Sequence, residues 1–168
     1  MITFVMLSVF PAALIVAAIN DVYEFKIPNW ITAALALAYL PASLAVAAPP
    51  AIVLEGVLLG VVTLLISFAL YTVKFFGGGD AKLFAATTPW IGIAGLGVFL
   101  VNTAIAGMFV AFFLIAFRKT PPLPVYAQAP WLMRLHQRKH DLPYGVAIAV
   151  GGLLSFQELP FFQLVYGG

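Results

Sequence analysis

Charged residues are scarce in this chain. They make up 8% of its 168 residues, while 64% are hydrophobic. An ordinary soluble domain carries about 25% charged residues. The polar side chains are too few to cover the surface of a soluble globule, so the composition excludes an ordinary soluble domain. Together with a mean hydropathy of +1.10, it indicates an integral membrane protein.

Cysteine is absent. Its absence excludes disulfides, thiolate nucleophiles and cysteine-based zinc or iron–sulfur sites. The net charge is only +2, a small basic excess that gives no reason to expect a nucleic-acid partner. The informative quantity is therefore the position of the charges along the chain.

Apolar runs dominate the remaining sequence. A membrane-spanning helix needs roughly 20 mostly apolar residues. The runs predict one all-α, polytopic membrane domain over residues 1–168, with helices at about 2–19, 27–48, 51–73, 81–94, 98–117 and 142–165. Only Met1 precedes the first run, without a basic residue, so we expect a retained helix there and not a cleaved leader.

The division at 94–98 rests on length. Residues 83–117 contain no charge, and at 1.5 Å per residue they would form about 52 Å of helix, too long for one ~30 Å crossing. Gly92, Gly95 and Gly97 indicate a break and favour two short crossings. The alternative is a re-entrant half-helix followed by one crossing.

The distribution of basic residues decides between these alternatives. With six crossings, all eight Lys and Arg fall in residues 20–26, 74–82 and 118–141, which would then face the cytoplasm. The re-entrant alternative would place five of them outside. We therefore predict six helices with both the N-terminus and the C-terminus outside. Residues 118–141 form a cytoplasmic loop, in which Trp131, Leu132 and Leu135 would meet lipid.

Two aspartates fall at the same predicted depth. Asp21 lies at the cytoplasmic end of the first helix, and Asp80 lies at the cytoplasmic junction of the third and fourth. Acids at this depth are costly unless they are solvated, paired or functional. Two carboxyl groups that share a site titrate in separate steps, so one keeps a proton while the other is ionised. Without Cys or a Ser–His–Asp pattern, paired acids are the most available catalytic machinery.

Each acid also has a purely structural interpretation. Asp80 follows three glycines and opens a helix, so it would serve as an N-cap. Asp21 would be an interfacial residue hydrated by headgroup water. The corresponding alternative is a non-enzymatic membrane subunit that uses Asp21 and Asp80 for ion or proton passage or for assembly.

Three short motifs resemble one protease family. Gly77-Gly78-Gly79-Asp80 has the form G-x-G-D, and Asp21 precedes Ile27-Pro28-Asn29 in the form D-x5-I-P-N. Residues 142–149, LPYGVAIA, resemble the start of the family's last helix. Together these motifs resemble the type IV prepilin peptidases, a GxGD class of intramembrane aspartic proteases. The small size resembles the Flp prepilin peptidases of tight-adherence pilus systems.

The resemblance implies an aspartic endopeptidase, with Asp21 and Asp80 as its catalytic acids and with no metal or organic cofactor. It implies a multi-pass protein of the bacterial inner membrane whose active site lies near the cytoplasmic face. Its partners would be a pilin precursor, membrane lipid and other pilus-assembly components. Larger members that also N-methylate the new pilin terminus carry a long insertion, often with a Cys tetrad, between the first two helices. Here that insertion and Cys are absent, so we expect peptidase activity without methyltransferase activity.

The neighbours of the two acids are candidate site-shaping residues: Gly77, Gly79, Lys82, Glu24, Pro28 and Asn29. Gly77 and Gly79 would let the substrate backbone approach the carboxylate. Glu24 would share a helical face with Asp21 if the first helix continues that far, and a solvated position is the favoured alternative.

Further polar residues and a glycine pair have other interpretations. His136 and His140 stand at i,i+4 but lack a convincing third ligand, so we expect no metal site. Gly56 and Gly60 form a GxxxG pattern that we interpret as helix packing. Glu55 suits the start of its helix, and Glu158 has no functional interpretation.

Overall fold

The computed structural model describes residues 2–74, 77–121, 129–138 and 141–167, with side chains from Leu7 onward. Every regular element in these residues is helical, which confirms the all-α prediction. The four long helices are α1 (Ile2–Glu24), α2 (Asn29–Ala45), α3 (Pro50–Thr72) and α4 (Gly78–Lys119). They are followed by α5 (Pro130–Gln137), α6 (Tyr144–Leu154), the 3₁₀ turn η2 (Phe156–Glu158) and α7 (Pro160–Tyr166).

The surface of the helices is strongly apolar. Among the described residues, α1, α3 and α4 are long and apolar enough to cross a membrane, and α2 and α6 are shorter apolar helices. Large side chains such as Leu44, Leu37 and Leu65 are exposed, as lipid contact requires. The chain is thus a multi-pass membrane protein, while the count of six crossings and the side on which the termini lie stay predictions.

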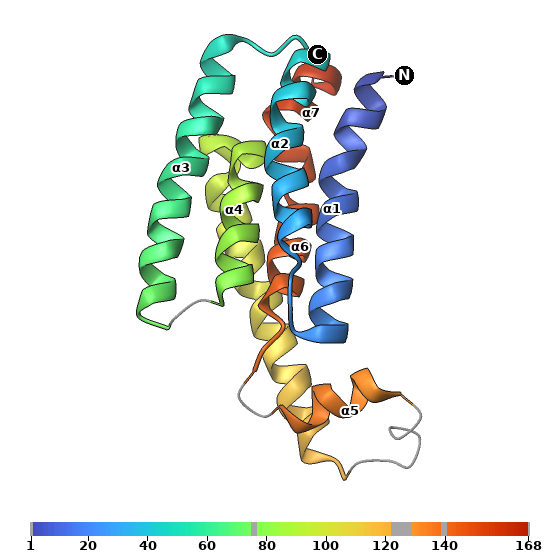
Figure 1. Cartoon of the computed structure of the whole chain (residues 1–168). Coiled ribbons are helices and arrows are strands. Elements are labelled where there is room, and N and C mark those ends of the chain that lie inside the picture. Colours follow the sequence, from blue (N-terminus) through green and yellow to red (C-terminus); the bar gives the residue numbers. More distant parts are fainter. Residues whose placement is uncertain (1, 75–76, 122–128, 139–140, 168) are drawn as a thin grey trace.

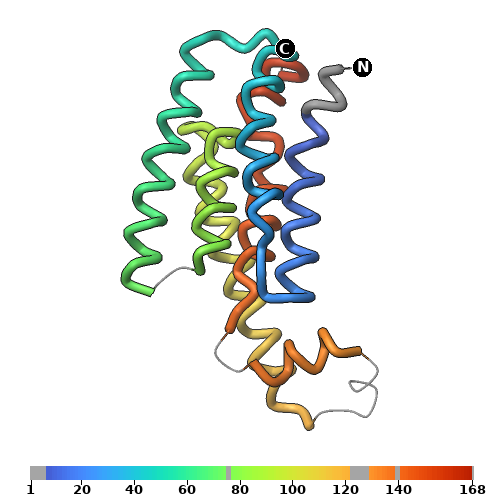
Figure 2. Tube along the Cα trace, in the orientation of Figure 1, coloured from blue at the N-terminus to red at the C-terminus, as the bar shows by residue number. Residues whose placement is uncertain are grey.

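The chain reverses direction inside α4, at Gly92 (Figure 2). Gly92 has φ +69° and ψ 171°, a conformation that essentially only glycine adopts. The carboxylate of Glu55 accepts a hydrogen bond of 3.0 Å from the Ile93 N–H directly after the reversal. The break expected between residues 94 and 98 therefore lies earlier. The two arms of α4 are residues 78–91 and 93–119, and Gly95 and Gly97 are inside the second arm.

The last predicted helix, residues 142–165, is not continuous. α6 ends at Leu154, the 3₁₀ turn η2 follows, and Leu159 is extended with ψ 128° before α7 starts at Pro160. Proline lacks an N–H and clashes with the preceding turn, so Pro160 favours the start of a new helix at this position. At the other end of the chain, α1 extends beyond the predicted residue 19 to Glu24. Asp21 is therefore inside a helix.

An aromatic cluster near the Gly92 reversal ties four helices together. Trp90 is fully buried, and its Nε1–H donates a hydrogen bond of 3.0 Å to the Leu35 carbonyl of α2. The rings of Phe10 from α1, Tyr39 from α2 and Phe161 from α7 lie 5.5 to 5.9 Å from the Trp90 ring. This aromatic part of the core lies toward the end of the molecule where α1 begins and α7 ends (Figure 1).

The glycines of the GxxxG pattern lie where α3 meets its neighbours. A Cβ atom on Gly56 would overlap the Tyr39 hydroxyl, and one on Gly60 would lie 2.7 Å from Cγ of Pro89. One helical turn further, the hydroxyls of Thr63 and Thr88 share a hydrogen bond of 2.7 Å. These contacts confirm the packing interpretation of the pattern.

The short helix α5 is attached to the opposite end of the bundle. Arg134 donates a hydrogen bond of 2.8 Å to the carbonyl of Tyr23, and the rings of Tyr23 and Trp131 are 5.0 Å apart. Arg118 at the end of α4 donates to the Leu135 carbonyl at 3.0 Å. The expectation that Leu135 meets lipid is wrong, because its side chain is buried against the protein.

Candidate active site

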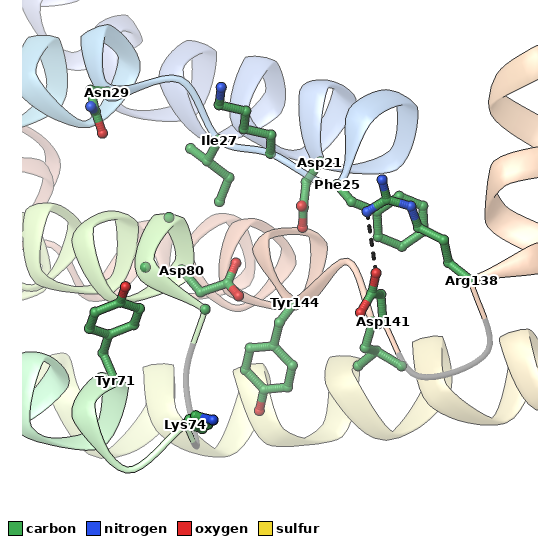
Figure 3. A pocket seen from close by; sticks show the side chains of 15 residues that line it. Asp21, Phe25, Ile27, Asn29, Tyr71, Lys74, Asp80, Arg138, Asp141 and Tyr144 are labelled. Carbon is green, nitrogen blue, oxygen red and sulfur yellow. Dashed lines mark hydrogen bonds and ion pairs between the residues drawn. The ribbon is translucent and has the colours of Figure 1, made fainter.

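Three segments distant in the sequence meet at the end of the bundle opposite the aromatic cluster. Asp21 lies in the last turn of α1, Asp80 in the first turn of α4, and Gly145 in the first turn of α6. The Asp21 side chain is buried and that of Asp80 is partly buried. Figure 3 shows both carboxyl groups pointing into one pocket. The two acids were predicted to lie at one depth, and in the structure their carboxyl groups also line one pocket.

A backbone amide of α6 binds one of the two acids. The N–H of Gly145 donates a hydrogen bond of 2.7 Å to Oδ2 of Asp21. The carboxyl group of Asp80 lies over the start of its own helix, where a Cβ on Gly77 would be 2.6 Å from Oδ2, and it lines the same pocket as Asp21. A charged acceptor gains roughly twice as much from such a bond as a neutral one. The arrangement therefore holds two carboxyls in one pocket, one of them bound to a backbone amide.

Asp80 is not the N-cap of its helix. Gly77 occupies that position with φ −69° and ψ 145°, and its carbonyl accepts the first helical hydrogen bond, from Ala81, at 2.9 Å. Asp80 is the third helical residue, from which an acidic side chain reaches back toward the N-cap amide. The structural interpretation of Asp80 as an N-cap is therefore wrong in position, although its carboxyl does lie over the start of the helix.

Close packing explains three glycines around the acids. A Cβ atom on Gly77 would lie 2.6 Å from Oδ2 of Asp80, and one on Gly145 would lie 2.8 Å from Oδ2 of Asp21. A Cβ atom on Gly79 would lie 3.2 Å from Cβ of Ile27. Distances under 3.0 Å force atoms to move, so Gly77 and Gly145 each leave the space that a carboxyl group occupies.

The packing of Ile27 explains why the D-x5-I-P-N motif has an apolar residue at this position. Its side chain is buried, with its Cβ beside Gly79 and its Cδ1 2.7 Å from the position of a Cβ on Gly145. It thus packs between the two segments that carry Asp80 and Gly145. Neither Ile27 nor Gly145 was singled out from the sequence, although both belong to the motifs that carried the resemblance.

The remaining predicted site-shaping residues lie at the margin of the site. Asn29 lines the pocket, and its Oδ1 accepts a hydrogen bond of 3.0 Å from Nζ of Lys82. This bond ties the start of α2 to α4, while Lys82 itself does not line the pocket. Pro28 precedes α2 as its N-cap residue. Glu24 is exposed and does not line the pocket, although α1 does continue to it.

The pocket around the acids has a volume of about 770 Å³. Its lining comes from the ends of α1, α3, α4 and α6 and from the segments beside them. These residues are Asp21, Phe25, Lys26, Ile27, Asn29, Tyr71, Lys74, Gly77, Gly78, Gly79, Asp80, Arg138, Asp141, Leu142 and Tyr144. Arg138 pairs with Asp141 at 3.2 Å and lies 5.2 Å above the ring of Phe25. The pocket therefore presents charged side chains, aromatic side chains and the glycine backbone of residues 77–79 next to both carboxyls.

The histidine pair does not form a ligand set in the described part of the chain. His136 shares a hydrogen bond of 2.8 Å with the Thr120 carbonyl, and His140 lies outside the described residues. Within the described ranges, no three His, Asp or Glu side chains gather in a way that would hold a metal ion. The chemistry that the pocket supports directly is proton transfer between two adjacent carboxyls and a bound water or peptide.

Comparison with known families agrees with the geometry. The model of the type IV leader peptidase family matches residues 8–115, which include both Asp21 and Asp80. A search of curated proteins and a search of solved structures each gave no match.

Proposed function

The chain belongs to the type IV leader peptidase family, and on this premise we propose that it is an aspartic endopeptidase that removes the leader from Flp-type prepilins. A membrane protease with a pilin precursor as its substrate follows from the family. The observation that supports Asp21 and Asp80 as the catalytic pair is that both carboxyls point into one pocket, where the amide of Gly145 binds Asp21.

The proposed reaction uses the two acids as one unit. The ionised carboxylate takes a proton from a water molecule, and the hydroxide adds to the scissile carbonyl carbon. The protonated carboxyl gives its proton to the carbonyl oxygen. When the tetrahedral intermediate collapses, the C–N bond breaks and the leaving amine takes up a proton and becomes the new pilin N-terminus. The roles of base and acid belong to the pair.

The charge distribution supports a cytoplasmic position for the site. Lys26, Lys74 and Arg138 line the pocket, and Arg118 and Arg134 hold α5 at the same end of the bundle. Basic residues beside membrane helices favour the cytoplasmic side. On this orientation the hydrophilic leader of the precursor reaches the acids from the cytoplasm, and the protein resides in the bacterial inner membrane.

The short connection between α1 and α2 supports a peptidase without methyltransferase activity. α1 ends at Glu24 and α2 begins at Asn29, which leaves no room for an inserted domain, and the chain contains no Cys. The test is to incubate the purified protein with S-adenosylmethionine and a cleaved pilin. Transfer of a methyl group to the pilin N-terminus would refute this part of the proposal.

The central experiment is co-expression with a candidate Flp pilin precursor. The mass of the pilin reports whether its leader has been removed. We expect the wild type to process the precursor. Asp21→Asn and Asp80→Asn, which keep the side-chain shape, should each slow processing by about 10²- to 10⁴-fold. Glu158→Gln is the matched control, since Glu158 is an exposed acid outside the pocket. Full-length precursor with the wild type, or processing by both Asn variants, would overturn the proposal.

The competing function is a non-enzymatic subunit in which the same acids conduct ions or stabilise an assembly. It predicts that Asp21→Asn and Asp80→Asn change conductance or complex formation while precursor processing is unaffected. Family membership and the shared pocket favour the peptidase.

A further inference from the structure

A second cavity, of about 400 Å³, lies between α3 and the second arm of α4. Its walls are mostly apolar and include Ile66 and Ser67 of α3, Leu100 and Ala104 of α4, and Tyr144 at the start of α6. We refer to this cavity as the α3–α4 groove. Its position differs from that of the catalytic pocket, since none of its lining residues except Tyr144 also lines the pocket.

Tyr144 joins the groove to the catalytic pocket. Its side chain lines both cavities, and the next residue, Gly145, supplies the amide that binds Asp21. The ring packs against α4 at Gly107, where a Cβ atom would lie 3.2 Å away. A substrate chain that extends from the two acids along Tyr144 therefore enters the groove directly.

The groove also opens toward the lipid. Ile66 is 54% exposed and Leu100 is 46% exposed, although both line the cavity. α3 contacts α4 further from the acids, at Gly60 and at the hydrogen bond between Thr63 and Thr88. Between this contact and the acids, the two helices leave an apolar cavity that a segment within the membrane can reach from the side.

We propose that the α3–α4 groove binds the apolar segment of the pilin precursor that follows the scissile bond. The proposal rests on the proposed function. A precursor cut at the membrane border has a polar leader on one side of the bond and a membrane helix on the other. The pocket of charged residues suits the leader, and the apolar groove that continues from it into the membrane suits one face of the helix, as in other helix-in-groove complexes.

A buried hydroxyl in the wall of the groove adds a second observation. Thr103 lines the groove and is 5% exposed, and its Oγ1 has no hydrogen-bond partner within the described residues. That oxygen faces Gly151 of α6, and threonine in a helix populates two χ1 rotamers. A buried hydroxyl without a partner is unfavourable. An occupant of the groove would therefore gain this hydrogen bond only once Thr103 has rotated its hydroxyl from Gly151 toward the groove.

The absence of cysteine makes a cross-linking test direct, because single cysteines need no altered background. Ile66→Cys and Leu100→Cys place a thiol in the groove. Leu65→Cys and Val101→Cys are matched controls, since these neighbours are similarly exposed, at 64% and 57%, but do not line the groove. Each variant also carries Asp80→Asn to keep the precursor intact. It is co-expressed with a precursor that has one cysteine in its apolar segment and is treated with a short bis-maleimide.

We expect cross-linking at positions 66 and 100 to exceed that at 65 and 101 at least tenfold. Equal or stronger cross-linking at the controls, while the wild type cleaves the precursor, would refute the groove and leave the protease function intact. Such a result would mean that lipid acyl chains alone fill the groove. If the wild type leaves the precursor full length, the protease function itself fails, and the groove proposal fails with it.

A second variant tests the groove by activity. Ala104→Trp fills the cavity from its exposed rim and should slow precursor processing about tenfold, through a raised KM. Val101→Trp adds the same bulk to the neighbouring lipid-facing position and serves as the control. Unchanged KM in Ala104→Trp would contradict the proposal.

Discussion

The hydrogen bond from Gly145 to Asp21 allows a quantitative prediction for Gly145→Ala. The added Cβ would lie 2.8 Å from Oδ2 of Asp21 and 2.7 Å from Cδ1 of Ile27. The Ile27 methyl can yield because it ends a flexible side chain. Oδ2 must retreat by about 0.6 Å to reach an ordinary contact distance of 3.4 Å. That retreat would stretch the 2.7 Å bond to about 3.3 Å, beyond the usual range.

The cost follows from the kind of bond. A hydrogen bond to a charged group contributes about 1.5–3 kcal/mol, and every ~1.4 kcal/mol lost from the transition state slows a reaction tenfold. If the bond holds Asp21 in its reactive position, Gly145→Ala should reduce kcat/KM for precursor cleavage roughly 10- to 100-fold. The fold should persist, because both clashes involve only the tips of side chains.

The assay is the initial rate of leader removal by purified protein in detergent micelles, together with the thermal unfolding midpoint. Gly97→Ala is the control. A Cβ there meets nothing within 4 Å, so its activity should stay within twofold of the wild type. A folded Gly145→Ala variant with wild-type kcat/KM would refute the argument that this amide positions Asp21.

Three further substitutions test the supporting structure. Gly92→Ala should destabilise the protein by about 1–3 kcal/mol, because alanine is strained at φ +69°; an unchanged unfolding midpoint would contradict this role of the reversal. Trp90→Phe removes the donor to the Leu35 carbonyl and should cost about 1–3 kcal/mol in denaturant unfolding, so a loss well below 1 kcal/mol would speak against it. Arg134→Gln should speed amide hydrogen exchange in α5, since the bond to Tyr23 is lost; equal exchange rates would show that α5 is held by other contacts.

Composition and periodicity predicted the helical class, the membrane environment and most helix positions. They failed where a single residue decides the backbone. The sequence alone does not distinguish Gly92, Gly95 and Gly97 as the position of the break, yet of these three only Gly92 has a positive φ. The choice depends on Glu55, which accepts the Ile93 N–H, and on Pro160, whose Cγ lies 2.8 Å from a Cβ on Gly92. Both contacts come from distant parts of the chain, which a local pattern does not contain.

The two acids of the candidate site could be predicted from the sequence, but the residues packed around them could not. Asp21 and Asp80 are visible in the sequence because acids are rare in apolar helices. Ile27 and Gly145 look like ordinary apolar and small residues among many others. Their importance lies in contacts with each other and with Asp21, and these contacts exist only once α1, α4 and α6 are packed together.

The segment that matches the family does not include α6, although α6 supplies a hydrogen bond to Asp21. The family match covers residues 8–115 and so contains both acids, yet the amide that binds Asp21 comes from Gly145, 30 residues past its end. Without α6, Asp21 would lose this hydrogen-bond donor, and Tyr144 would no longer wall both the pocket and the groove. A buried carboxylate without such donors is strongly disfavoured. The two acids therefore form the candidate site only when α6 packs beside α1 and brings the amide of Gly145 to Asp21.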